Sequence, residues 1–123
     1  MAIRTETGWK LTYEDYVAIP ADLQRHEIPD GVHHVNPAPN IDHQEVSKRI
    51  QAQLFRYFDE AGRGAVFDAP VDLQLGETNV IQPDLVVIHQ DRRHIITPTR
   101  IKGTPDLVIE IISPSSRKAS TMS

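Results

Sequence analysis

The 123-residue sequence contains no cysteine, which excludes disulfide bonds and thiolate metal sites and is typical of a reducing compartment. No apolar run approaches the length of about 18 residues that a membrane-spanning helix requires. The first residues do not resemble a secretory signal peptide, and no glycine-rich phosphate loop is present. These absences predict a cytoplasmic protein with no membrane segment and no organic cofactor.

Positive charge is also scarce. The formal net charge of −4 argues against a broad phosphate-binding face of the kind that non-specific DNA-binding proteins carry, although it leaves room for a local basic cleft. Hydrophobic residues make up 39% of the chain and charged residues 24%, as in ordinary soluble domains. We expect residues 1–123 to form a single domain with a buried core.

One apolar stretch carries a charge where a buried strand is expected. Residues 107–112 are rich in β-branched side chains and lie between Thr104-Pro105 and Ser113-Pro114, so they predict a central strand. Glu110 lies in the middle of this strand. A carboxylate among such neighbours is costly to bury, so Glu110 must face a solvated cleft or contact a metal ion, a lysine or an arginine.

An earlier stretch repeats this pattern. Pro83-Asp84 and the apolar residues after it match Pro105-Asp106 and its own apolar run. If the two strands pair antiparallel about the centre of the connector 89–104, Asp84 lies directly opposite Glu110, with Cβ atoms roughly 4.5–5.5 Å apart. Like charges so placed repel, so the pair needs a bound cation or a raised pKa. Mg2+ with oxygen ligands meets this need.

Local signals define the N-terminal elements. The capping-box pattern at Thr12-Tyr-Glu-Asp15 predicts a short helix over about 12–18, with Tyr13, Tyr16 and Val17 turned inward.

A strong turn signal at Asp30-Gly31 predicts a hairpin with strands near 25–29 and 32–36. Glu27, on the first of these strands, either points toward the carboxylate pair or is an ordinary surface glutamate.

The longest helix is expected over about 41–61, with Asn40 as its N-cap and Gly62 as its stop signal. Apolar residues recur on it at intervals of three to four and predict an inward stripe that includes Val46, Ile50, Leu54, Tyr57 or Phe58, and Ala61. His43, in the first turn, either faces the site or belongs to the polar surface.

Residues 65–75 predict one strand with a solvated face, because the alternation from Pro70 onward would bury Leu75 and expose Gln74. Another strand is expected over 81–88.

The connector 89–104 is the most basic segment and is either a solvated loop or a contact for a phosphate backbone. The six histidines lack a zinc-binding pattern such as His-Glu-x-x-His and are expected at the surface.

Several motifs occur together, in the order in which one known family has them. They are Leu11-Thr-Tyr-Glu-Asp-Tyr16, His26-Glu27, Asp30-Gly31, Pro39 with His43-Gln44, Pro70-Val71, Gln82-Pro-Asp84 and the stretch from Gly103 to Ser116. The Pro-Asp motif followed by an acid inside an apolar strand resembles the PD-(D/E)XK nuclease superfamily. The whole set, over about 11–118, resembles the Uma-two family of that superfamily, domain of unknown function 820.

The resemblance implies a restriction-endonuclease-like α+β fold, in which a mixed β-sheet is flanked by helices. It implies that Asp84 and Glu110 bind Mg2+ (or Mn2+) in an endonuclease that hydrolyses phosphodiester bonds in DNA. The metal would polarise the phosphoryl oxygens and lower the pKa of the attacking water. Glu27 and His43 match recurrent positions of the family and are further catalytic candidates.

A lysine that stabilises developing charge completes such sites. The superfamily's usual lysine position is Ile112 here, and the family's lysine is expected on a helix beyond the Ser-Pro-Ser segment, where Lys118 is the nearest candidate apart from Arg117. The closing helix and strand of the family fold have no counterpart in this sequence, so we expect a domain truncated at its C-terminal end.

Truncation supports an alternative hypothesis, in which the chain is a catalytically inactive remnant that acts as a dimerising or nucleic-acid-binding module. A missing strand would leave unpaired backbone groups at one edge of the sheet. We therefore expect a homodimer that covers this edge.

Overall fold

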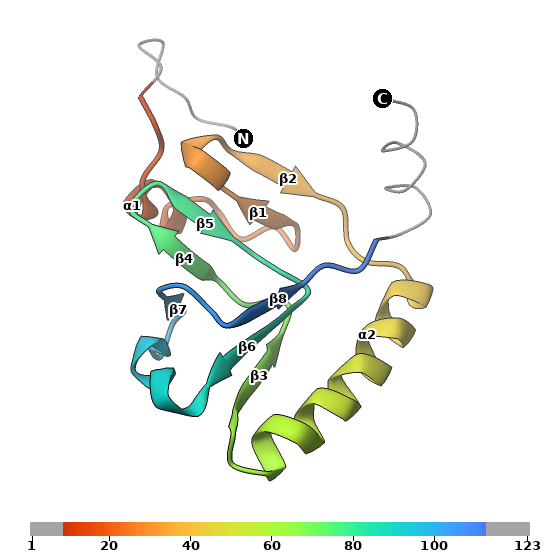
Figure 1. The fold of residues 1–123 in the computed structure, drawn as a ribbon. Coiled ribbons are helices and arrows are strands. Elements are labelled where there is room, and N and C mark those ends of the chain that lie inside the picture. The colour runs from red at the N-terminus through yellow and green to blue at the C-terminus, as the bar shows by residue number, and fades with distance from the viewer. Residues whose placement is uncertain (1–8, 113–123) are drawn as a thin grey trace.

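A computed structural model describes residues 9–112. The chain folds into a two-stranded and two three-stranded β-sheets beside one long helix, α2 (Figure 1). One of the three-stranded sheets contains a parallel pair, and all other strand pairs are antiparallel. The predicted mixed α+β fold is confirmed, although the sheet is divided into smaller pieces.

The first element is the short helix α1, Tyr13–Val17. The Thr12 side chain and the Asp15 side chain bond reciprocally to each other's main-chain N–H groups, so the predicted capping box is present. Tyr16 is buried, as predicted. Val17 is 59% exposed, and the prediction that it faces inward was wrong, because in so short a helix only one face contacts the core.

Strands β1, Arg25–Glu27, and β2, His34–Asn36, form the predicted hairpin. A short 3-10 turn, Pro29–Gly31, connects them. Gly31 has φ of +80°, and a Cβ atom there would lie 2.3 Å from the Cβ of Lys10, so only glycine fits this turn.

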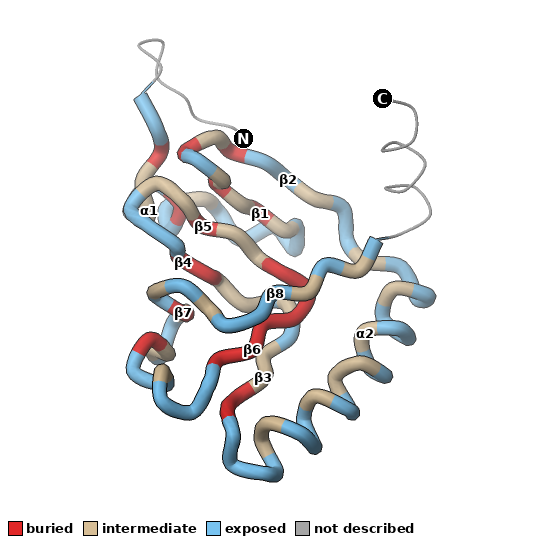
Figure 2. Tube along the Cα trace, viewed as in Figure 1, coloured by how far each residue is buried: buried red, intermediate tan, exposed pale blue. Residues whose placement is uncertain are grey.

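Helix α2, Ile41–Leu54, continues as a π-helical turn, Phe55–Glu60. The Asn40 side chain accepts a hydrogen bond of 2.8 Å from the main-chain N–H of His43, as an N-cap does. None of the helix residues is buried, and Figure 2 shows the helix without a buried segment. The predicted inward stripe was wrong in this respect, because among residues 9–112 little besides β3 packs against α2, which leaves Val46 45% exposed.

The single strand predicted over 65–75 was also wrong. The chain forms β3, Gly64–Asp68, and β4, Leu73–Gly76, which lie in different sheets. The cis peptide bond between Ala69 and Pro70 lies in the connection between them.

Within β4 Leu73 is buried, as predicted, but Gln74 is also buried and Leu75 is exposed, against the prediction. Two causes are visible: the Arg100 side chain donates a hydrogen bond to Gln74 Oε1, and the register shifts between Gln74 and Gly76. The buried amide thus has a polar partner, and the shift turns Leu75 outward.

The second three-stranded sheet has the order β5-β4-β7 and contains β5, Asn79–Ile81, and β7, Ile101–Lys102. Part of the basic connector is a 3-10 segment, Gln90–Ile95, rather than a plain loop. Arg100 lies over the Tyr13 ring, and Arg92 approaches Asp106 at 3.7 Å, so two of the connector's basic residues have protein partners.

The other three-stranded sheet has the order β3-β6-β8, with β6, Leu85–His89, in its centre and β8, Leu107–Ile109, at its edge. Strands β6 and β8 are antiparallel, with Leu85 opposite Ile109 and Val87 opposite Leu107. This is the predicted register, and its next step places Asp84 opposite Glu110. Among the described residues β8 is an edge strand with exposed apolar side chains, so the prediction of a central strand was wrong.

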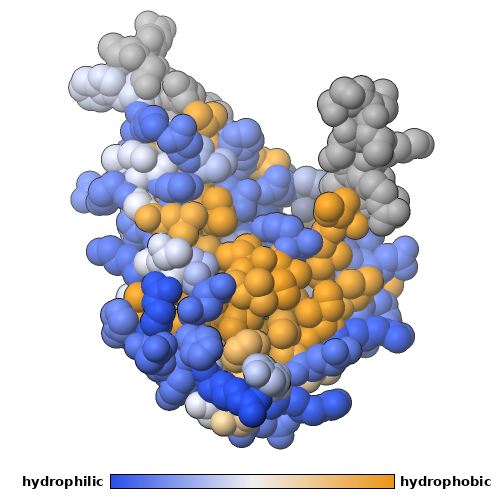
Figure 3. Space-filling view, viewed as in Figure 1, coloured by the Kyte–Doolittle hydropathy of each residue, from blue (hydrophilic) through white to orange (hydrophobic). Residues whose placement is uncertain are grey.

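Apolar side chains form two buried clusters, one on β4, β6 and β7 and one joining α1 to β5. A large apolar surface also remains exposed across the middle of the molecule (Figure 3). The exposed apolar residues include Leu107 and Val108 of β8 and Val46 of α2. None of the helices within residues 9–112 has the length and apolar character needed to cross a lipid bilayer.

Candidate active site

Asp84 lies directly before β6 and is the most enclosed acid of the site, with 3% exposure. Oδ1 lies 3.3 Å from Nη1 of Arg25 and 3.1 Å from Nε2 of His43. Oδ2 accepts a hydrogen bond of 2.7 Å from the main-chain N–H of Ile111. These donors come from β1, α2 and the segment after β8, so one carboxylate connects three parts of the fold.

Glu110 follows β8 and lies beside Asp84 at the wall of the same cleft. The pKa of Glu110 is raised to about 7, first by desolvation and then by the negative charge of Asp84, by the hydrogen bond to it and by the charge of Glu27; Arg25 lowers it. The two acids therefore share one site, as the sequence predicted. Near neutral pH the protein stabilises a proton, or another cation, between them.

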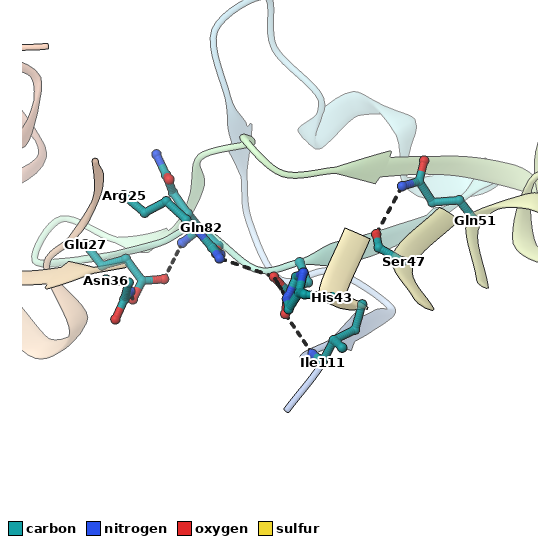
Figure 4. Close-up of polar contacts among 9 residues, drawn as sticks. Arg25, Glu27, Asn36, His43, Ser47, Gln51, Gln82 and Ile111 are labelled. Carbon is teal, nitrogen blue, oxygen red and sulfur yellow. Dashed lines mark hydrogen bonds and ion pairs between the residues drawn. The ribbon is translucent and has the colours of Figure 1, made fainter. Parts of the chain in front are cut away.

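Glu27 is held in one orientation by two hydrogen bonds. Oε1 accepts from the side-chain amide of Asn36 at 2.7 Å, and Oε2 accepts from the main-chain N–H of Gln82 at 2.6 Å. In Figure 4 these residues lie beside Arg25, at one end of the row of polar side chains. Of the two interpretations of Glu27, the structure supports the one in which it belongs to the site.

His43 projects from the first turn of α2 toward Asp84, and its side chain is 12% exposed. The polar-surface interpretation of His43 was therefore wrong.

Arg25 was not identified from the sequence. Its guanidinium group contacts Asp84 and also donates a hydrogen bond to the carbonyl oxygen of Gln82, while its buried Nε has no hydrogen-bond partner within residues 9–112. The available signal was its position two residues before Glu27 on a strand, where alternate side chains share a face.

The acids Glu27, Asp84 and Glu110 line one cleft of about 470 Å³, together with Arg25 and His43. With all three acids ionised and His43 neutral, these groups carry a net charge of two negative units, which a single divalent cation would balance. Within residues 9–112 no cluster of three or more histidine and acidic side chains has the geometry of a metal site. Asp84 and Glu110 supply carboxylate oxygens, the type of ligand that Mg2+ takes in proteins.

Two further predictions concern residues elsewhere. Lys118, the candidate lysine, lies outside the described residues. The expectation that the histidines lie at the surface was wrong for His26 and His33, which are buried, stacked and joined by a hydrogen bond of 2.9 Å. His26 also bonds to Asp22, so this pair is part of the hairpin's polar core.

Comparisons with known proteins agree with this fold. No curated protein matches the chain. A solved structure from Anabaena variabilis, described as "a putative nuclease belonging to DUF820", has the same fold, with a TM-score of 0.71 at 19% sequence identity. The match covers 91% of this chain and 65% of that one, so this chain spans about two thirds of its solved relative. The profile of the Uma2 family, described as "Putative restriction endonuclease", matches residues 13–121, and the chain therefore belongs to the Uma2 family.

Proposed function

We propose that the protein is a metal-dependent endonuclease that hydrolyses phosphodiester bonds in DNA, with Mg2+ or Mn2+ held by Asp84 and Glu110. The observation that carries the proposal is the pairing of these two carboxyl groups across adjacent strands, in a cleft that also holds Arg25. Membership of the Uma2 family, described as "Putative restriction endonuclease", supports the choice of reaction.

The roles of the residues follow from their contacts. Asp84 is the fixed ligand, because the Ile111 N–H and the His43 ring hold both of its oxygens in place. Glu110 is the second ligand once its carboxyl proton has left. Arg25 presents a cation at the wall of the cleft, where it can attract the phosphate backbone.

Glu27 is better suited to positioning than to proton transfer, because both of its oxygens already accept hydrogen bonds. When bound, a divalent ion supplies Lewis-acid stabilisation of the charge that develops on the phosphoryl oxygens. A lysine would add to this stabilisation, and Lys118 is the candidate within this sequence.

Metal binding can be tested without relying on catalysis. Mg2+ or Mn2+ should raise the melting temperature of the wild type, because a ligand present at 100 times its Kd stabilises the folded state by about 2.7 kcal/mol. Asp84→Asn should abolish this increase and also the cleavage of plasmid DNA. Asp91→Asn, at a side chain that is 82% exposed, is the matched control and should respond as the wild type does.

The alternative function, an inactive module that dimerises or binds nucleic acid, is favoured by one observation. The edge strand β8 and the apolar surface around it are exposed within residues 9–112. The same titration separates the two functions. If neither Mg2+ nor Mn2+ changes the melting temperature, and Asp84→Asn is neutral or stabilising, the endonuclease proposal is wrong and the module is favoured.

A further inference from the structure

A second cavity, of about 270 Å³, opens beside the acidic cleft between α2 and the end of β3. Pro39, His43 and Asp84 line both spaces, so the second cavity adjoins the proposed metal site. A nucleotide next to the bond being cut would be placed here. None of the roles assigned above uses this cavity.

The wall of the cavity formed by α2 is polar and uncharged. His43, Ser47 and Gln51 follow one another at intervals of four residues, which places them on one face of the helix. Figure 4 shows Ser47 and Gln51 continuing the row of polar side chains beyond His43. Gln44 adds an exposed amide to the same cavity.

Hydrogen bonds orient the Gln51 amide. Its Nε2 donates to Ser47 Oγ at 3.1 Å and to Asp68 Oδ2 at 3.4 Å. Both bonds involve the amide N–H groups, and no donor within residues 9–112 bonds to Oε1 of Gln51. Oε1 of Gln51 therefore keeps its capacity to accept a hydrogen bond, and Gln51 lines the cavity together with the Asp68 carboxylate, which also accepts hydrogen bonds.

This acceptor-rich lining disfavours the phosphate group of a nucleotide and favours a hydrogen-bond donor on its base. Asp68 would repel a phosphate group, and no lysine or arginine lines the cavity to offset its charge. An exocyclic amino group of a base supplies the donors that these acceptors require, as when glutamine binds adenine. Thymine has no such amino group.

We infer that this cavity binds an amino-bearing nucleobase, such as adenine or cytosine, of the nucleotide that flanks the scissile phosphate. The inference rests on the proposed nuclease function and adds a base preference to it. Gln51 and Asp68 contact the amino group, and Gln44 contacts the remaining base edge.

The test measures binding separately from cleavage. Fluorescence anisotropy with single-stranded homopolymeric oligodeoxynucleotides, in Ca2+ in place of Mg2+, gives the affinity of the wild type for adenine, cytosine and thymine strands. The wild type should bind the adenine and cytosine strands about tenfold more tightly than the thymine strand, as expected for one good base contact. Gln51→Ala should reduce this preference to near unity, and Gln44→Ala should weaken it.

Gln53→Ala is the matched control, since Gln53 is an exposed glutamine on α2 that does not line the cavity. It should keep the full preference, and all three variants should melt as the wild type does. Equal affinity of the wild type for the three strands would overturn the base-binding site while leaving the nuclease proposal intact. The base-binding site would also be overturned, with the nuclease proposal intact, if Gln51→Ala and Gln53→Ala had the same effect on the base preference. If the wild type binds none of the strands, the base-binding inference is wrong, and the cleavage of plasmid DNA decides the nuclease proposal separately.

Discussion

Replacement of Glu110 by glutamine provides a direct measure of the electrostatic repulsion between Glu110 and Asp84. Glutamine has the shape of a protonated glutamic acid and can donate a hydrogen bond to Asp84, but it cannot ionise. In the absence of metal, Glu110→Gln should therefore match the wild type at pH 5 and be more stable than the wild type at pH 8.

The sign follows from the direction of the shift. The pKa of Glu110 is raised from 4.5 to about 7, mainly by desolvation and by the charge of Asp84, so between these values the folded protein binds a proton that the unfolded chain has lost. Stability therefore falls as the pH rises through this window and stays low above pH 7. The full shift corresponds to about 3 kcal/mol. Glu110 is exposed as a residue, however, so screening by solvent reduces the expected effect to on the order of 1 kcal/mol.

Urea unfolding at pH 5, 6, 7 and 8, followed by circular dichroism in EDTA, measures the difference in free energy of unfolding between variant and wild type. Taking the difference removes the contribution of the histidines, which titrate in both proteins. Glu77→Gln, at an exposed side chain in the turn between β4 and β5, should give a difference that does not change with pH. If the Glu110→Gln difference is also flat, or if the wild type gains stability relative to it at pH 8, the two carboxyl groups do not interact as described.

The remaining predictions concern the fold. Tyr16→Phe should lower the free energy of unfolding by about 1–3 kcal/mol, because the hydroxyl donates to Asp72 at 2.7 Å and accepts from Gln82 at 3.0 Å in a half-buried network; a loss below about 0.5 kcal/mol in urea unfolding would contradict this role. The edge of β8 that is unpaired within residues 9–112, together with its exposed apolar residues, predicts self-association. Sedimentation velocity should detect a dimer that Val108→Lys dissociates, and a wild type that is monomeric at high concentration would contradict the prediction.

Local patterns in the sequence determined which segments form several elements and how the two key strands pair. Some signals involve contacts within only a few residues and can therefore be predicted from the sequence. They are the capping box at Thr12, the N-cap Asn40 and the Asp30-Gly31 turn. The register that opposes Asp84 and Glu110 was also predictable, because it depends only on the centre of the connector between two similar strands.

Non-local contacts decided the rest. Arg25 joins the site because the hairpin packs against the segment before β6, a contact between residues almost 60 positions apart. The break between β3 and β4 and the burial of Gln74 depend on which sheet each strand enters and on a partner as distant as Arg100. Periodicity identifies the apolar face of α2, but burial of that face depends on what packs against it. Among the described residues little packs against it. The free energy gained by burial depends on the apolar area that a contact removes from water, which the periodicity of a single helix does not specify.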